Sequence, residues 1–351
     1  MIDPRWGFRR GTTKPYPVQG SAATATPGPV VLDLKDYFPK ETLAQLRIRV
    51  FGNIVVTDPG GGVAGTPTGK DNPEAMLVSA NLVTSPSYGV QTVQNLFPRA
   101  LNRMNAFDRG YQIAAPSIPN AAGTYAVNVE YLINFKRGGS IIPIEYSLPM
   151  SVFDTAQLTL NFGGAEQFFT GGTFQWNFQN LQVEIRAYFD VGVAGKFHIT
   201  EFLEKDVQIL GTQTDLEIPT LAAGYYYTDL LIMTERDNVL VNDILNNATI
   251  QSAGRIWEPQ GDSNAFSVQQ LSRDQRISDP AFNMTGLYMF SFLQDGMYSN
   301  AVECMDAKLT VLLDVTSGSG SQFARCIFRR MIPQGIDATG TQALTASGSS
   351  T

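Results

Sequence analysis

Few side chains in this sequence are of the types that carry nucleophilic or metal-dependent chemistry. Its 351 residues include one histidine, His198, and two cysteines, Cys304 and Cys326. One imidazole cannot build a histidine-rich zinc centre, and a Ser–His–Asp or Cys–His catalyst would have to use His198 as its base. His198 stands between apolar neighbours, so we interpret it as a polar side chain on a strand. We expect both cysteines to be small apolar core residues in a reducing compartment.

A glycine-rich stretch at 59–71 is where a phosphate-binding loop could form, because glycine backbones can surround a phosphate. Its spacing does not fit the pattern. Ala64 stands five residues before Gly69, where the first glycine is needed, and Asp71 follows Lys70, where a serine or threonine is needed. We therefore predict a long exposed hairpin loop.

Carboxylates gather at Asp229, Glu235, Asp237 and Asp243, but their spacing matches no calcium loop with a glycine at its sixth position. We interpret them as solvated loop carboxylates and leave open a cation bound between subunits. A glycosidase needs two carboxyl groups about 5–10 Å apart, and nothing in the sequence favours any two of its 32 acidic residues. We predict no catalytic, cofactor-binding or metal-binding residue.

The composition favours an all-β protein. Charged residues make up 16% of the chain, below the roughly 25% of an average soluble protein. Glycine (32), proline (19) and aromatic residues are plentiful. The net charge of −7 argues against a surface that wraps nucleic acid, and we expect no sequence-specific nucleic-acid partner. No apolar run approaches the roughly 20 residues that cross a bilayer, and no secretory signal is recognised, so we expect synthesis in a cytoplasm.

The secondary structure is predicted to be mainly β-strand, because apolar and polar residues alternate with a period of two in several stretches. Any functional side chain would be held by these strands or by the loops between them. The clearest stretches are 46–56, 125–135, 181–189, 288–292, 309–315 and 324–328. In the last of them, Ala324, Cys326 and Phe328 are expected on one face, with Arg325 and Arg329 on the other. Two short helices are predicted, one within 90–106, interrupted by Pro98, and one at 263–276, with Ser263 as its N-cap.

The chain divides near residues 191–200 into two β-rich halves. A short echo joins them, because DTAQLTL at 154–160 resembles DAKLTV at 306–311. We predict tandem β-sandwiches between two tails. Residues 1–29 are expected to form a mobile basic arm that carries Arg5, Arg9, Arg10 and Lys14, and 335–351 a flexible polar tail. The arm would either bind a neighbouring protein, an anionic lipid surface or a genome, or be an untethered terminus, and the residues alone leave both interpretations open.

The order of several segments resembles a known family. A first strand LRIRVFGNIVVT (46–57) is followed by IIPIEYSLPMSVFDTAQL (141–158), with the turn pattern PM-x-x-FDTA at 149–156. The second half ends with G-x-Y…F…DG from Gly286 and then L-x-V-x-L-D-V-T from Leu309. Across about residues 40–333 the chain resembles the double jelly-roll major capsid proteins of tailless, icosahedral phages with an internal membrane.

The resemblance implies two eight-stranded jelly rolls, at 30–195 and 196–334, between the arm (1–29) and the tail (335–351). It implies homotrimeric, pseudo-hexagonal capsomers that contact neighbouring capsomers, penton proteins and minor capsid proteins. Arg5, Arg9, Arg10 and Lys14 would face the interior and meet an internal viral membrane. The loops 59–71 and 255–280 are the candidates for an outward tower. The protein would be located in the virion and assembled in the host cytoplasm.

The predicted function is therefore a structural major capsid protein of a bacteriophage, without enzymatic activity and without a cofactor. Two alternatives stay open. A receptor- or carbohydrate-binding β-sandwich would present exposed aromatic side chains, for which 225–227 (three tyrosines) and Trp257 are the candidates. A glycan-cleaving β-sandwich would need a cleft with paired carboxylates.

Overall fold

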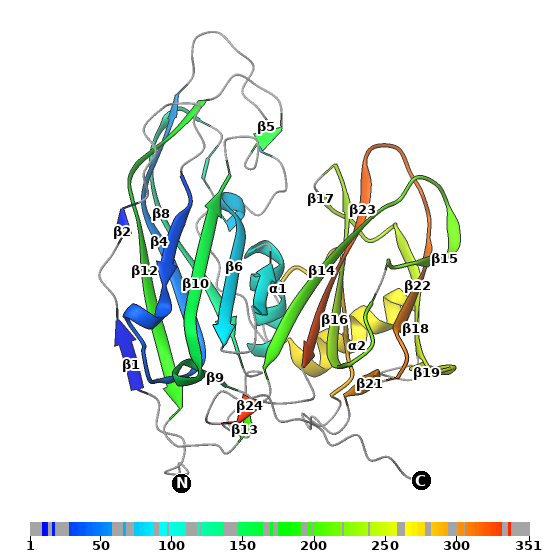
Figure 1. The fold of residues 1–351 in the computed structure, drawn as a ribbon. Coiled ribbons are helices and arrows are strands. Elements are labelled where there is room, and N and C mark those ends of the chain that lie inside the picture. The colour runs from blue at the N-terminus through cyan, green and yellow to red at the C-terminus, as the bar shows by residue number, and fades with distance from the viewer. Residues whose placement is uncertain are drawn as a thin grey trace, which may run out of the picture.

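The computed structural model shows a molecule built almost entirely from strands (Figure 1). It describes residues 9–12, 16–17, 28–57, 66–67, 74–86, 91–96, 98–109, 118–119, 121–135, 147–163, 169–170, 175–190, 196–197, 199–219, 221–237, 239–257, 264–277, 282–293, 301–304, 306–331 and 336–337. No helix among these residues is long and apolar enough to span a bilayer.

The first half of the chain forms two antiparallel sheets. Sheet I contains β1 (Arg9–Thr12), β2 (Tyr16–Pro17), β12 (Gln175–Asp190), β4 (Thr42–Thr57), β8 (Gly123–Asn134) and β9 (Leu148–Pro149). Sheet II contains β3 (Val30–Asp33), β10 (Phe153–Phe162), β6 (Leu77–Pro86) and β7 (Gln91–Leu96). The 3-10 turns η1 (Leu34–Asp36), η2 (Glu74–Met76) and η4 (Met150–Val152) connect some of these strands.

The second half repeats this architecture. Sheet III contains β14 (Thr200–Gln208), β23 (Gln322–Met331), β16 (Tyr225–Arg236), β17 (Val239–Leu240), β20 (Leu287–Ser291) and β21 (Val302–Cys304). Sheet IV contains β15 (Gln213–Glu217), β22 (Leu309–Val315), β18 (Leu245–Ser252) and β19 (Arg255–Trp257). The helices α1 (Pro98–Arg109) and α2 (Ala265–Arg276) complete the two halves.

Both halves follow one strand plan. With the eight main strands of each half numbered along the chain, one sheet has the order first, eighth, third, sixth, and the other has the order second, seventh, fourth, fifth. In the first half these orders are β1/β2–β12–β4–β8 and β3–β10–β6–β7; in the second they are β14–β23–β16–β20/β21 and β15–β22–β18–β19. This is the eight-stranded jelly roll, so the predicted fold class, two tandem jelly rolls, is confirmed.

Details of the repeat agree with the plan. The echo between 154–160 and 306–311 places Leu158 and Leu309 in the seventh strand of each half, and both are buried. The helices α1 and α2 each lie between the fifth and sixth strands. The echo therefore joins segments that are equivalent in the two halves.

All six predicted stretches form strands, and several extend beyond the expected ranges, but β20 does not alternate because all five of its residues are buried. Along β4, Leu46, Ile48 and Val50 are buried, while Arg47 and Arg49 are half-buried on the other face. The strand β16 does not alternate, since Thr228–Glu235 is buried without interruption. Continuous burial along a strand is typical of a sheet that is covered on both faces.

Two local expectations are corrected. The segment before Pro98 is strand β7 rather than helix, and Pro98 is the first residue of α1 instead of a break within it. Proline suits this position because the first helical N–H has no intrahelical partner. At α2 the N-cap is Asn264, not Ser263, since the Asn264 Oδ1 accepts hydrogen bonds from the backbone N–H of Phe266 (3.0 Å) and Ser267 (3.3 Å).

The predicted mobile arm also needs correction. Arg9–Thr12 and Tyr16–Pro17 pair with β12 at the edge of sheet I, so they supply the first strand of the first jelly roll. We expected a mobile arm because the segment has too few apolar residues to form a core. Pairing with the edge strand β12 stabilises it instead, through backbone hydrogen bonds that need no apolar side chains. The jelly roll of the first half therefore begins before residue 30.

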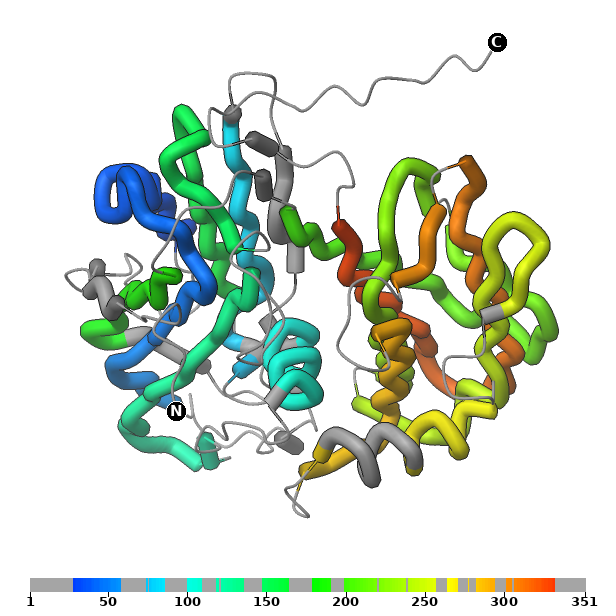
Figure 2. Tube along the Cα trace, turned by 90° about the horizontal axis from the view of Figure 1, so that it is seen from below, coloured from blue at the N-terminus to red at the C-terminus, as the bar shows by residue number. Residues whose placement is uncertain are grey.

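The two jelly rolls share part of their core. Figure 2 shows them side by side, with α1 at the boundary between them. The second half has its own core between sheets III and IV, which includes Leu230, Ile232 and Phe328. Leu231, Met233 and Ile327 face away from that core and belong to the hydrophobic cluster of the first half. One face of sheet III is thus buried against the first jelly roll.

The ends of the molecule differ. The two-residue strands β5 (Thr66–Pro67) and β11 (Phe169–Thr170) pair at one end, and β13 (Lys196–Phe197) pairs with β24 (Ile336–Asp337) at the opposite end (Figure 1). The remainder of the predicted hairpin loop at 59–71 lies outside the described residues.

A β-bulge between β4 and β12 predicts the effect of one substitution. Gly52 has φ +150°, and a Cβ there would lie 2.7 Å from the Asn180 carbonyl oxygen. Gly52→Ala should lower the free energy of unfolding by about 1–3 kcal/mol, since strain of this kind has that cost. Denaturant unfolding of the purified protein measures it. Gly211→Ala is the control, because a Cβ at Gly211 would meet nothing within 4 Å. Equal losses for the two variants would contradict the prediction.

Candidate functional site

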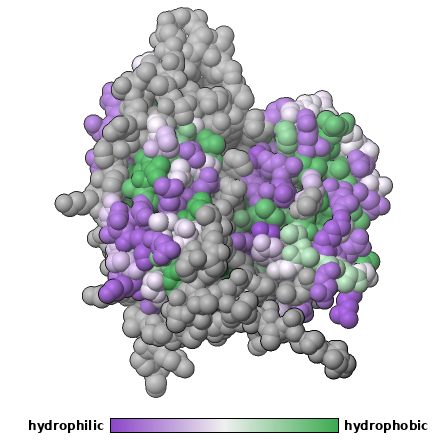
Figure 3. All heavy atoms as spheres, viewed as in Figure 1, coloured by the Kyte–Doolittle hydropathy of each residue, from purple (hydrophilic) through white to green (hydrophobic). Residues whose placement is uncertain are grey.

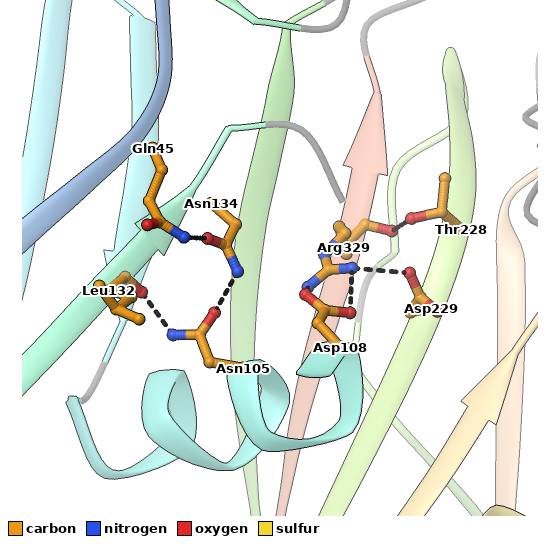
Figure 4. Close-up of polar contacts among 8 residues, drawn as sticks. All are labelled: Gln45, Asn105, Asp108, Leu132, Asn134, Thr228, Asp229 and Arg329. Carbon is orange, nitrogen blue, oxygen red and sulfur yellow. Dashed lines mark hydrogen bonds and ion pairs between the residues drawn. The ribbon is translucent and has the colours of Figure 1, made fainter. Parts of the chain in front are cut away.

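The most strongly buried charged groups of the described residues lie where the two jelly rolls meet (Figure 4). The side chain of Arg329, on β23, is 2% exposed, and those of Asp108 on α1 and Asp229 on β16 are fully buried. The Arg329 guanidinium donates to both carboxylate oxygens of Asp108, at 2.6 and 3.1 Å, and to Asp229 Oδ2 at 3.3 Å. One arginine therefore joins a helix of the first half to a strand of the second.

The surroundings make this contact a structural one. The Phe202 ring lies 5.2 Å from Arg329 Cζ, so an aromatic face covers the guanidinium. Asp108 lies near the C-terminal end of α1, where the helix dipole disfavours a negative charge and a neighbouring guanidinium offsets it. Two carboxylates and one guanidinium, all removed from water, tolerate the loss of a partner poorly. The group holds the halves together and has no exposed surface for a substrate.

The same helix is attached to sheet I by amide side chains (Figure 4). Asn105 Nδ2 donates to the Leu132 carbonyl oxygen, and Asn134 Nδ2 donates to Asn105 Oδ1 at 2.6 Å. Gln45 Nε2 in turn donates to Asn134 Oδ1. Asn105 and Asp108 are about one turn apart, so one helix contacts sheet I and sheet III at once. Nothing in the spacing of α1 had singled out these residues.

The carboxylate cluster predicted from the sequence is only partly a loop feature. Asp229 and Glu235 are buried on β16, which corrects the expectation of solvated side chains. They are tolerated there because Arg329 and Arg325 lie on the adjacent strand; Arg325 is 3.8 Å from Glu235 and 3.2 Å from Glu204. The parity predicted for Arg325 and Arg329 is correct, but their face of the strand meets protein rather than water.

The other two carboxylates organise a turn. Asp237 Oδ1 accepts a hydrogen bond from the Ser321 N–H at 2.9 Å, and Arg236 forms an ion pair of 2.9 Å with Asp243. Within the described part of the chain, no group of three or more His, Cys, Asp or Glu side chains could hold a metal ion.

The predicted core cysteines are buried, as expected. Burial raises the pKa of both thiols, most strongly for Cys326, so neither is an activated nucleophile. The Cys304 thiol donates to Ser252 Oγ at 3.3 Å. His198 lies outside the described residues.

The tyrosines proposed for carbohydrate binding do not form an exposed platform. Tyr227 is fully buried, and Tyr225 is half-buried beneath the Arg330 guanidinium, 3.7 Å from the ring centroid. Tyr226 is half-buried beside Glu303. Trp257 is in β19, and its side chain lies outside the described residues.

The cations of the basic segment are placed in part. Arg9 pairs in register with Phe189 and Arg10 with Tyr188 at the edge of sheet I, whereas Arg5 and Lys14 lie outside the described residues. Of the second tower candidate, 255–280, the described part consists of β19 and α2, which pack on β18 and β20. This part is not a protruding loop.

Comparison with known proteins identifies the fold. No family model and no curated protein matches the sequence. Solved structures do match. They include the major capsid protein of Sulfolobus turreted icosahedral virus (TM-score 0.68, 11% identity, 93% of this chain and 97% of that chain covered). The major capsid protein of bacteriophage PM2 matches with a TM-score of 0.55 (11% identity, 95% and 100% covered), and the PBCV-1 virus capsid with 0.57 (10% identity, 96% and 98% covered). The expected likeness to double jelly-roll capsid proteins is confirmed for the fold.

The buried arginine allows a direct test of the junction. Arg329→Met leaves two buried carboxylates without their guanidinium, and we expect it to lower the free energy of unfolding by about 3–5 kcal/mol. Denaturant unfolding measures the loss. Lys40→Met is the control, because Lys40 is exposed and surface changes of this kind stay within about 0.5 kcal/mol. A loss for Arg329→Met no larger than that of the control would show that the junction does not depend on this ion pair.

Proposed function

We propose that this chain is the structural subunit of an icosahedral viral shell, a major capsid protein without catalytic activity. The observation that carries the proposal is the repetition of one jelly-roll plan in two halves that share a core. A chain built in this way presents two similar walls side by side to its neighbours. The solved structures of the same fold named above are themselves viral capsid proteins.

The surface and the polar clusters support a structural role. Hydrophilic and hydrophobic side chains are interspersed over the coloured parts of both halves in Figure 3. This pattern suits contacts that are spread over many residues better than one dominant apolar patch. The strongest ion clusters of the described residues lie between strands and helices, where they stabilise the walls.

Three such chains would place six jelly rolls in a ring, which is the geometry of a pseudo-hexagonal capsomer. We propose this homotrimer as the unit that contacts neighbouring capsomers, penton proteins and minor capsid proteins. The proposal extends to a virion of the bacteriophage type with an internal membrane, assembled in the host cytoplasm.

Light scattering of the purified protein, with micrographs of the same peak, tests the capsomer. Three copies of the 38.3-kDa chain have a mass of about 115 kDa, and the particles should show a hexagonal outline. A monomer that stays monomeric at high concentration would refute the proposal and would favour the receptor-binding alternative.

The basic segment is proposed to contact the internal membrane through Arg5, Arg9, Arg10 and Lys14. The strand β1, which contains Arg9 and Arg10, lies toward the end of the molecule nearest the β13–β24 pair, away from β5 (Figure 1). Replacing all four cations by glutamine should weaken binding to anionic vesicles, because each cation near such a surface contributes about 1 kcal/mol. Vesicle sedimentation at low salt measures the loss.

Charge substitution is preferable to deletion, since removing 1–29 would also remove β1 and β2. Replacing Lys35, Lys40, Lys205 and Lys308 by glutamine is the control for net charge. Vesicle binding that falls equally for both variants would contradict a specific role of the segment.

A further inference from the structure

The in-chain junction uses elements with a defined place in the strand plan. The fifth strand of the first half, β7, contacts the first strand of the second half, β14. The helix that follows the fifth strand, α1, lies at the same junction and is joined to sheet III by the Asp108–Arg329 ion pair. Residues Ala100–Phe107 of α1 are buried at every position. At this junction, the fifth strand and the following helix of the first jelly roll contact the sheet of the second jelly roll that contains its first strand.

The equivalent elements of the second half are partly exposed in the described part of the chain. They are the fifth strand, β19, and the start of α2, and both lie along β18: Ile256 pairs with Gln251, and Asn264 forms a bridge with Asn247. Ile256 is 62% exposed and Phe266 is 68% exposed, two of the most exposed large apolar side chains of the described residues. The described start of α2 is thus exposed on one side, whereas Ala100–Phe107 of α1 are buried at every position.

Among the described residues, the first-strand edge of the first half, β1 and β2, makes no contact like that of β14 with β7. There β1 and β2 pair with β12, and among the described strands they pair with no other. Each chain therefore has two different free edges. One is β19 with the start of α2, which is equivalent to β7 and α1; the other is β1–β2, which is equivalent to β14.

We propose that β19 and the start of α2 dock on the β1–β2 edge of sheet I in a second copy of this chain, repeating between chains the junction that β7 and α1 make within one. The inference rests on the proposed capsomer and specifies which surfaces form it. Because the two edges differ, the contact is head-to-tail, and three copies related by a threefold rotation, as in the proposed capsomer, close into a ring.

Charge favours this arrangement. Residues 1–195 contain 15 Lys and Arg against 14 Asp and Glu, a net charge of +1, whereas 196–351 contain 10 against 18, a net charge of −8. If the second half of one chain contacts the first half of the next chain, the two acidic second halves do not face each other. Like charges that face each other across an interface are unfavourable, so the two halves should alternate around the ring.

The first experiment changes the exposed apolar side chains. Ile256→Asp with Phe266→Asp should weaken association about tenfold or more, because a carboxylate would be buried at the contact. Light scattering over a dilution series should then show monomer where the unchanged protein is still trimeric. Leu210→Asp is the control, since Leu210 is 85% exposed on the turn between β14 and β15, away from this edge. Circular dichroism verifies that all variants are folded.

The outcomes separate this inference from the proposed function. A trimeric double variant beside a trimeric unchanged protein would overturn the docking surface and leave the capsomer in place. If the unchanged protein were monomeric at every concentration, the capsomer itself would be refuted. Equal weakening by Leu210→Asp would also overturn the inference, because the effect would then reflect added charge rather than the edge.

A second experiment tests the partner edge. A variant with Thr12→Cys and Ile256→Cys, treated with a short bismaleimide, should give covalent dimers and trimers on a denaturing gel, while each single variant should not. The native thiols are buried and give little background. Cross-linking of the Ile256→Cys single variant to itself would show a symmetric contact and would overturn the head-to-tail inference.

Discussion

Sheet III has two faces to bury, and the shape of the chain follows from this. On one face its residues pack against sheet IV, and on the other Leu231, Met233 and Ile327 need cover that the second half cannot supply. The first half supplies it, with α1 between the jelly rolls and the Arg329 guanidinium between Asp108 and Asp229. Sheet I differs, because its outer face carries half-exposed ion pairs such as that of Arg49 with Glu184, at 3.4 Å. The equivalent sheets thus have unequal outer faces, since part of that of sheet III is buried against the first half.

Much of the architecture could be predicted from alternation alone. In strands with one partly exposed face, such as β4 and β22, apolar and polar residues alternate with a period of two, and this alternation is visible in the sequence. The resemblance in segment order gave the tandem jelly rolls, and the short echo fell on equivalent strands. These features depend on local patterns that each half repeats.

What could not be predicted depends on contacts between distant residues. Asp229 and Glu235 look like solvated acids because nothing local shows that Arg329 and Arg325 lie on the neighbouring strand. Arg9–Thr12 looks like a tail because its partner, β12, comes more than 170 residues later. The role of Asp108 was invisible for the same reason, since its partner is 221 residues away. Burial on both faces also hides alternation, as β16 demonstrates.

The connections at one end of the two jelly rolls have a consequence for how such a surface can change. In each half the connection after the third strand is tied to the connection after the seventh, by the β5–β11 pair in the first half and by the Asp237–Ser321 hydrogen bonds in the second. The first of these connections spans 58–73 and its counterpart 237–244. These contacts close the base of each connection next to the sheets. Residues inserted farther out in the connection therefore leave the strands unchanged, and a longer loop adds little to the free-energy cost of folding. In the proposed shell, this end of each jelly roll can therefore change in length and sequence while the strands of the two sandwiches stay the same.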